Sequence, residues 1–176
     1  MEYLTTMSTA VTAAPRWLTP DQQEAWRAYL RGSRLLEAAL DRDLQSHGVQ
    51  LSEYEIISML SEAPGRRLRM SSLADLVVQS RSRLTHTAAR LEKRGWVRRE
   101  SCLDDRRGVE LVLTDTGLDA IRAMAAVHVE SVRRHLVDVV PPEMFQAVGE
   151  AMSRVGEASG ETSGEPTPSP RASSPA

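Results

Sequence analysis

Residues 80–114, SRSRLTHTAARLEKRGWVRRESCLDDRRGVELVLT, constrain the fold of this chain more than any other stretch. Ser80 is a good helix N-cap, because its hydroxyl can accept a hydrogen bond from a free backbone N–H of the first turn. An apolar stripe at helical spacing follows, made of Leu84, Ala88 and Leu91. Gly95 then ends the helix, since glycine readily adopts the positive φ of a helix C-terminus. The stretch therefore predicts a helix over residues 80–95.

Directly after this helix the pattern changes to that of a β-hairpin. Residues 97–100 and 109–113 are rich in apolar or β-branched side chains, which is typical of short strands. Between them, the polar turn 104–108 reads DDRRG and carries two arginines at its tip. A helix followed at once by a hairpin with a basic tip is the outline of a winged helix. In that arrangement the helix fills a DNA major groove and the tip reaches an adjacent minor groove.

Two shorter helices are expected before this unit. The first starts near Ser52, which has the spacing of a capping box with Glu55, and it stops at residues 63–65, Ala-Pro-Gly. Its predicted buried side contains Tyr54, Ile57 and either Met59 or Leu60. The second is capped by Ser71 or Ser72, and its predicted core face contains Leu73, Ala74, Val77 and Val78. The basic residues 66–70 form a link or a first strand of the sheet, and the whole resembles a helix-turn-helix.

Long helices are predicted on both sides of this lobe. Thr19, Pro20 and Asp21 are a strong helix start, and apolar residues then recur at helical spacing to about residue 47. A helix of this length in a small domain usually packs against another chain or spans two parts of the fold. After the hairpin a second long helix is expected, with an apolar stripe of Leu118, Ile121, Ala125, Val129, Val132, Leu136 and Val139. A last helix follows Pro141-Pro142 and is predicted to turn Phe145, Val148, Met152 and Val155 inward.

The charge of the chain is unevenly distributed. The full sequence has 22 Lys and Arg against 24 Asp and Glu, for a formal net charge of −2. Residues 66–107 contain 12 Lys and Arg against 5 Asp and Glu, so the remainder is strongly acidic. One basic window in an acidic chain favours a module that presents a single face to a phosphate backbone over a general polyanion binder.

Composition excludes several classes of protein. The chain of 176 residues is 41% hydrophobic, enough for one domain with a real core, and it has one cysteine, Cys102. A disulfide within the chain is therefore impossible, and a cytoplasmic, nucleoid-associated location is the simplest expectation. Neither a membrane span nor a signal peptide is evident in the sequence, and the tail 158–176 has the composition of a disordered segment.

Residues 69–117 resemble the DNA-binding core of the MarR family, the multiple antibiotic resistance regulators. The family pattern consists of an S-x-L-A helix, a recognition helix of the form S-x-S-x-x-T…L-E-x-x-G-x-V, and a wing of the form D-x-R-x-x-x-V-x-L-T. All three parts occur here in this order, with Leu111 in place of the usual valine. The flanking helices also match in number and length, so the resemblance covers about residues 19–157.

The resemblance implies a mainly α fold with a small β-hairpin wing (α+β), that is, a winged helix-turn-helix lobe with long N- and C-terminal dimerisation helices. The implied organisation is a flexible arm, 1–18, a dimerisation helix, 19–50, the DNA-binding lobe, 51–114, C-terminal dimerisation helices, 115–157, and a disordered tail, 158–176. It further implies a homodimer that reads a pseudo-palindromic operator on double-stranded DNA. The resemblance also implies a transcriptional regulator, usually a repressor, that responds to a small aromatic or phenolic effector.

The candidate DNA-binding residues lie on the recognition helix and the wing. On the helix they occupy the side opposite the apolar stripe, and they are Ser80, Arg81, Ser82, Arg83, Thr85, His86 and Arg90. On the wing, Arg107 is the minor-groove candidate and Arg106 is expected to contact a phosphate. The family pattern suggests that Asp105 braces Arg107 through a carboxylate–guanidinium pair. Arg98 and Arg99 alternate along a strand, so only one of them can face DNA.

The effector site is less defined by the sequence. The candidate ligand-binding residues near the expected cleft are Trp26, Tyr29, Arg34, His47 and Tyr54, with Arg27 or Arg31 as alternative partners of a ligand carboxylate. Packing in the core or in a dimer interface is the competing interpretation for each of them. No protein cofactor and no metal site is predicted.

Three other functions compete with ligand-responsive DNA binding. A redox sensor would use Cys102, whose pKa neighbouring arginines could lower. A winged helix that binds a protein partner would lack a basic recognition face, which this chain has. An enzyme is disfavoured, because the sequence contains none of the common catalytic motifs, phosphate loops or metal-ligand spacings.

Overall fold

The structure of the chain is a computed structural model that describes residues 15–102 and 108–159. The chain divides into two compact units, residues 1–35 and residues 36–176. Helix α1 (Pro20–Gln45) begins in the first unit and continues into the second. Its start is capped as predicted, since Thr19 and Gln22 exchange hydrogen bonds between side chain and backbone N–H, at 3.0 and 3.3 Å.

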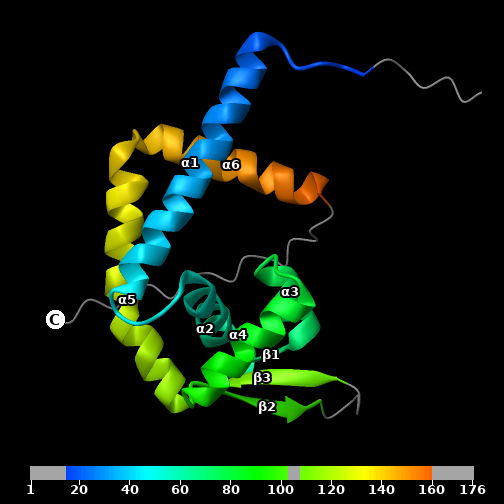
Figure 1. The fold of residues 1–176 in the computed structure, drawn as a ribbon, viewed down its shortest axis with the longest axis vertical. Helices are drawn as coiled ribbons and strands as arrows, with labels where there is room; N and C mark the ends of the chain where they lie inside the picture. The colour runs from blue at the N-terminus through cyan, green and yellow to red at the C-terminus, as the bar shows by residue number, and fades with distance from the viewer. Residues whose placement is uncertain (1–14, 103–107, 160–176) are drawn as a thin grey trace, which may run out of the picture. The chain divides into compact units, whose positions relative to one another are not determined.

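The second unit contains the elements of a winged helix-turn-helix (Figure 1). After the end of α1 they follow in the order α2 (Leu51–Glu62), β1 (Arg67–Arg69), α3 (Met70–Leu76), α4 (Arg81–Lys93), β2 (Val97–Ser101), β3 (Val109–Leu113), α5 (Asp115–His135) and α6 (Pro142–Ala158). Short 3-10 turns over residues 64–66 and 137–139 lie between them. The predicted fold class is confirmed, including a first strand in the basic link after α2.

The sheet is antiparallel with the strand order β1–β3–β2. The core lies between this sheet, the three short helices and the start of α5. Its fully buried side chains include Leu44, Ile56, Ile57, Leu60, Leu73, Leu84, Leu91 and Leu111. Burying leucine and isoleucine from several elements at once holds the short helices in place, since isolated helices of this length are marginal in water.

Two predicted helix caps are wrong. The capping box of helix α2 lies two residues earlier than predicted and uses Gln50 and Glu53 instead of Ser52 and Glu55. The backbone N–H of Gln50 donates to the Glu53 carboxylate at 3.1 Å. Helix α3 is preceded by Arg69 as its N-cap and has no side-chain cap, so neither Ser71 nor Ser72 caps it. In both places the helix N-cap lies earlier in the chain than the serine that local propensity favours as a cap.

Val78 was predicted in the core and is 74% exposed. It lies in the tight turn between α3 and α4 and takes a positive φ of 48°. That conformation is unfavourable for a β-branched residue and directs its side chain away from the core face of α3. Leu73 and Ala74 are buried as predicted. The requirements of the turn therefore override the helical pattern at this position.

The long helix after the hairpin is shorter than predicted, and the predicted apolar stripe is buried only in part. It ends at His135, and residues 137–139 form a separate turn. Its buried residues are Gly117, Ile121, Met124 and Ser131, while Val129 and Val139 of the predicted stripe are 56% and 64% exposed. The first part of the predicted stripe does pack on the lobe, since Ile121 belongs to the core cluster and Leu118 packs against it.

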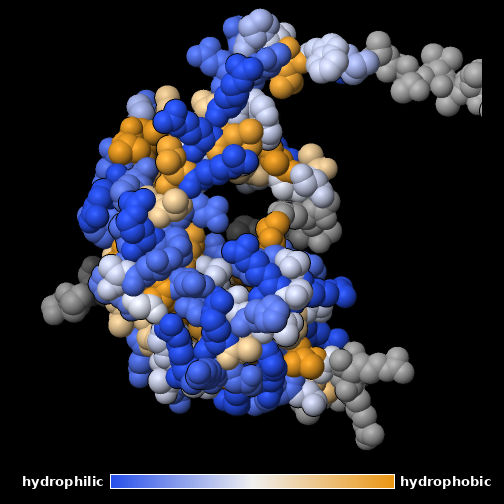
Figure 2. All heavy atoms as spheres, in the orientation of Figure 1, coloured by the Kyte–Doolittle hydropathy of each residue, from blue (hydrophilic) through white to orange (hydrophobic). Residues whose placement is uncertain are grey.

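Helix α6 starts at Pro142, as predicted, but its apolar side chains do not point into a core. In the described structure Phe145, Val148, Met152 and Val155 are between 36% and 54% exposed, and none of the residues of α6 is buried. Figure 2 shows hydrophobic side chains at the surface where α6 lies, and a largely hydrophilic surface on the winged-helix lobe.

Candidate nucleic-acid interface

Helix α4 presents one polar face, and its other face is anchored in the core. Ser80 caps it as predicted, with its hydroxyl accepting from the Arg83 backbone N–H at 3.2 Å. The buried residues are Leu84, Thr87, Ala88 and Leu91. This anchoring fixes the rotation of the helix, so the side chains on its other face have defined positions.

The predicted DNA-contacting residues of α4 are all exposed on that free face. They are Ser80, Arg81, Ser82, Arg83, Thr85, His86 and Arg90. Within the described part of the chain, Arg81, Arg83 and Lys93 form no ion pair, so their charges remain available to an external anion. The first turn of α4 therefore carries two guanidinium groups, Arg81 and Arg83, that form no ion pair among the described residues.

The other arginines of the basic window are largely used inside the protein. Arg90 bonds to Glu53 at 3.1 Å and to the Gln50 side chain at 2.6 Å. Arg99 lies against α4, where it donates to the Thr85 carbonyl at 3.1 Å and lies 3.6 Å from the Glu92 carboxylate. The local excess of positive charge in the sequence thus overstates the number of arginines without an internal carboxylate partner.

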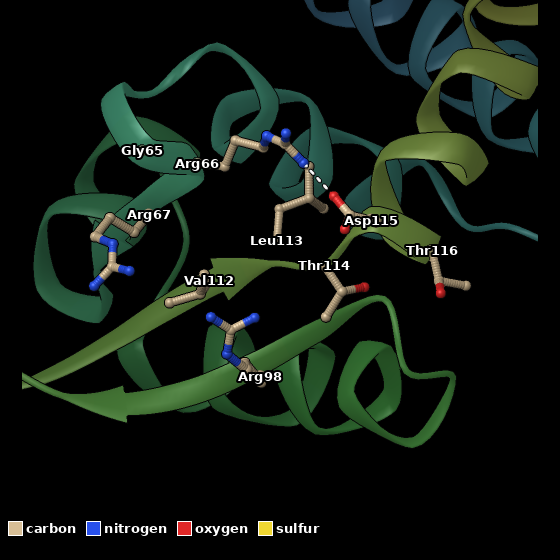
Figure 3. Close-up of a pocket in the computed structure, with 9 residues that line it drawn as sticks. All are labelled: Gly65, Arg66, Arg67, Arg98, Val112, Leu113, Thr114, Asp115 and Thr116. Atoms are coloured by element: carbon tan, nitrogen blue, oxygen red, sulfur yellow. Dashed lines mark hydrogen bonds and ion pairs between the residues drawn. The ribbon is translucent and has the colours of Figure 1, made fainter.

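A ladder of charged residues crosses the outer face of the sheet. Arg67 and Arg98 stand on either side of Val112 in one row (Figure 3). Both bond to Glu100, at 3.3 and 2.6 Å. Arg67 also pairs with Glu110 at 3.4 Å. The bond from Arg98 to Glu100, and to a lesser extent the charge of Arg67, lower the pKa of the Glu100 carboxyl. The open groove beside this ladder has a volume of about 590 Å³, but its arginines are already neutralised by carboxylates.

The wing tip is not part of the described structure. Asp105, Arg106 and Arg107 lie outside the described residues, so their predicted roles stay predictions. Just before the tip, Cys102 is buried, with 5% of its surface exposed, and its backbone N–H donates to the Gly108 carbonyl at 3.0 Å. Redox-active cysteines are usually accessible, so burial disfavours the alternative of a sensor at Cys102.

The candidate ligand residues have different surroundings. Trp26 and Tyr29 stack on each other, 5.7 Å apart, and with the exposed Arg34 they belong to the first unit. His47 lies in the turn after α1, bonded to Ser46 at 2.9 Å. Tyr54 is 7% exposed and belongs to the core cluster, which matches the competing interpretation for this residue.

The Tyr54 ring packs on a histidine that the sequence did not single out. His128 of α5 lies 4.3 Å from it, between ring centres, and its Nδ1 is buried with no hydrogen-bond partner among the described residues. Burial lowers the pKa of His128. The folded state therefore favours the neutral ring, and stability is expected to fall as the pH drops through about 6.5, where the unfolded chain takes up the proton.

This expectation can be checked by urea denaturation at pH 7.5 and pH 5.5. A His128→Gln chain cannot take up the proton, so its midpoint should change less between the two pH values than that of the natural chain. Equal changes in both chains would mean that His128 does not contribute to the pH dependence of stability.

The described residues contain neither a metal-binding cluster nor a membrane-spanning helix. No group of three His, Cys, Asp or Glu side chains among them is placed to hold a metal ion. None of their helices has the length and apolar character needed to cross a membrane.

Comparison with known proteins identifies the family. Residues 47–108 match a family model described as MarR family. The crystal structure of AbsC, a MarR family transcriptional regulator from Streptomyces coelicolor, is 46% identical with a TM-score of 0.76 and covers 82% of this chain and 97% of its own. The chain belongs to the MarR family. The resemblance found in the sequence is therefore confirmed.

Other members of the MarR family extend the comparison. Sco3205 from Streptomyces coelicolor, whose structure is a complex with DNA, is 45% identical, has a TM-score of 0.78 and covers 83% of this chain and 92% of its own. The regulator PecS from Dickeya dadantii is 32% identical over 114 residues, and the repressor MprA from Escherichia coli is 31% identical over 90 residues. These alignments span 64% and 51% of this chain, and 66% and 51% of the relatives' own lengths.

Glu53 and Gln50 are site residues that the sequence analysis missed. Both lie at the start of α2, and their side chains bond to Arg90 of α4. The signal was present, because Gln50 and Glu53 have the same i, i+3 spacing that was assigned to Ser52 and Glu55. Their connection to α4 could not be read from that spacing, since 37 residues separate Glu53 from Arg90.

Proposed function

We propose that the chain is a transcriptional regulator that binds double-stranded DNA in a sequence-specific manner, with α4 in the major groove and the 104–108 turn in the minor groove. The observation that carries this proposal is the exposed face of α4, whose first turn has two arginines that form no ion pair with the described residues, and whose back face is fixed in the core. Arginine at such positions can bind guanine bidentately or pair with phosphate. The comparisons support the proposal, since a relative of 45% identity forms a complex with DNA.

The proposal includes a homodimer that reads a pseudo-palindromic operator. The support for a dimer is the apolar face of α6, because exposed apolar residues at regular spacing mark a surface that packs against a partner. Two α4 helices about one DNA turn apart would then contact the two half-sites. The proposed role is that of a cytoplasmic, non-enzymatic repressor released by a small aromatic or phenolic effector, and MprA is a relative named as a repressor.

Selection of duplexes from a random DNA pool tests the proposed DNA binding directly. The purified full chain is mixed with the pool at physiological salt, and bound duplexes are amplified and sequenced. A recovered inverted repeat, bound at least about 1000-fold more tightly than scrambled DNA, is the expected result. Recovery of no shared sequence would contradict the proposal and favour a winged helix that binds a protein partner. Release of the selected duplex by one member of a panel of aromatic acids would support the effector.

The wing is tested by the Arg107→Ala substitution. If this arginine enters the minor groove, its loss should weaken binding to the selected duplex by about 1–3 kcal/mol without unfolding the protein. Competition binding measures the change, and circular dichroism checks the fold. Unchanged affinity would remove Arg107 from the interface.

A further inference from the structure

Glu53 is the most completely buried charged side chain in the described core. It lies in the first turn of α2 and is 1% exposed. Burying a carboxylate costs several kcal/mol unless it is paired and hydrogen-bonded. The partners here are Arg90 of α4, with Nε at 3.1 Å, and Arg94 directly after α4, with Nη2 at 3.7 Å. One buried charge thus connects the start of α2 to the C-terminal half of α4.

The geometry of Arg90 shows what this connection can do. Its Nε donates to Glu53 and its Nη2 donates to the Gln50 side chain, so two edges of the guanidinium are fixed. Among the described residues Nη1 has no hydrogen-bond partner, and the side chain remains 48% exposed. A guanidinium fixed in this way is oriented before any ligand arrives, which reduces the conformational entropy lost on binding.

Arg90 lies at the edge of a groove between α2 and α4 whose lining suits an anion. The groove has a volume of about 420 Å³ and is lined by Gln50, Ser52, Ser80, Ser82, Arg83, His86, Thr87 and Arg90. Every one of these side chains can donate a hydrogen bond, and none is a carboxylate. The free face of α4, which carries the proposed DNA contacts, forms one side of this groove.

We infer that Glu53 is a positioning residue for DNA binding, which holds Arg90 at the edge of this groove so that the guanidinium meets one phosphate of the duplex backbone. The inference rests on the proposed DNA binding. A fixed phosphate contact of this kind sets the register of α4 along the groove of the DNA and carries no base preference itself.

The Glu53→Gln substitution separates positioning from simple electrostatics by the sign of its effect. Removing a negative charge next to DNA should strengthen binding if only long-range charge matters. If Glu53 positions Arg90, the loss of this anchor should instead weaken DNA binding. We expect about 3- to 10-fold weaker binding to the duplex selected with the natural chain. The glutamine keeps an oxygen for the Gln50 backbone N–H, so the start of α2 is preserved.

Three further variants make the test specific. Glu62→Gln removes the same charge from an exposed position at the other end of α2, and its affinity should equal or slightly exceed that of the natural chain. Gln50→Ala removes the second anchor without a change of charge and should weaken binding by about 2- to 5-fold. Arg90→Ala should lower the slope of log affinity against log salt by about 0.9, the value for one lost phosphate contact.

The deciding measurement is the Glu53→Gln change in an Arg90→Ala background. If Glu53 acts through Arg90, the second substitution should cause no further loss of affinity. Equal losses in both backgrounds would overturn the inference, as would unchanged or tighter binding by Glu53→Gln alone. If Glu53→Gln does not fold, Gln50→Ala decides in its place, and unchanged binding by it would overturn the inference. A natural chain that selects no duplex would instead refute the proposed function, and this inference with it.

Discussion

A Val148→Asp chain is expected to be monomeric and to bind the selected duplex at least about 100-fold more weakly than the natural chain. Val148 lies in the middle of the apolar face of α6 with Phe145, Met152 and Val155, and in the described structure no other part of the chain buries it. A carboxylate placed in an apolar dimer interface would be desolvated without a partner, at a cost of several kcal/mol. Without the dimer, each half-site would be bound singly.

Analytical ultracentrifugation and competition binding measure the two effects. Gln146→Asp is the matched control, because it adds the same charge to the same helix on the side away from the apolar face. It should remain dimeric and bind DNA normally. A Val148→Asp chain that stays dimeric would show that α6 does not form the interface through this face.

The second large effect is expected from Gly117→Ala, which should lower the free energy of unfolding by at least about 3 kcal/mol. Gly117 is buried in the first turn of α5, where an added Cβ would collide with the backbone carbonyl of Trp96 and with the Leu113 side chain. The carbonyl cannot easily move, because it accepts hydrogen bonds from the Thr114 backbone N–H and hydroxyl, both at 3.0 Å. The substitution would therefore push α5 away from the start of β2.

Urea denaturation followed by circular dichroism measures this loss. Thr116→Ala is the control, since Thr116 is the exposed neighbour in the same turn and its loss should change stability little. If Gly117→Ala is as stable as the natural chain, the close approach of α5 and β2 is not required for the fold.

The sequence predicted the winged-helix lobe well because its signals are local. Ser80 caps α4, Gly95 ends it with a φ of 73°, and Thr114 caps α5 through a bond from the Gly117 N–H at 3.0 Å. Each of these signals acts within a few residues. The predictions failed where a tight turn or a distant partner decided the outcome, as at Val78, whose position in the turn exposes it.

What the sequence by itself determined is the order of the helices and strands, the polar face of α4 and the MarR family resemblance, because periodicity and capping are properties of neighbouring residues. Only the tertiary structure decided which arginines form an ion pair with a carboxylate of the protein. Arg67, Arg90 and Arg99 find their carboxylates on other elements, while Arg81 and Arg83 do not among the described residues. Ion pairing depends on distances in space that packing sets, so net charge along the sequence cannot reveal it.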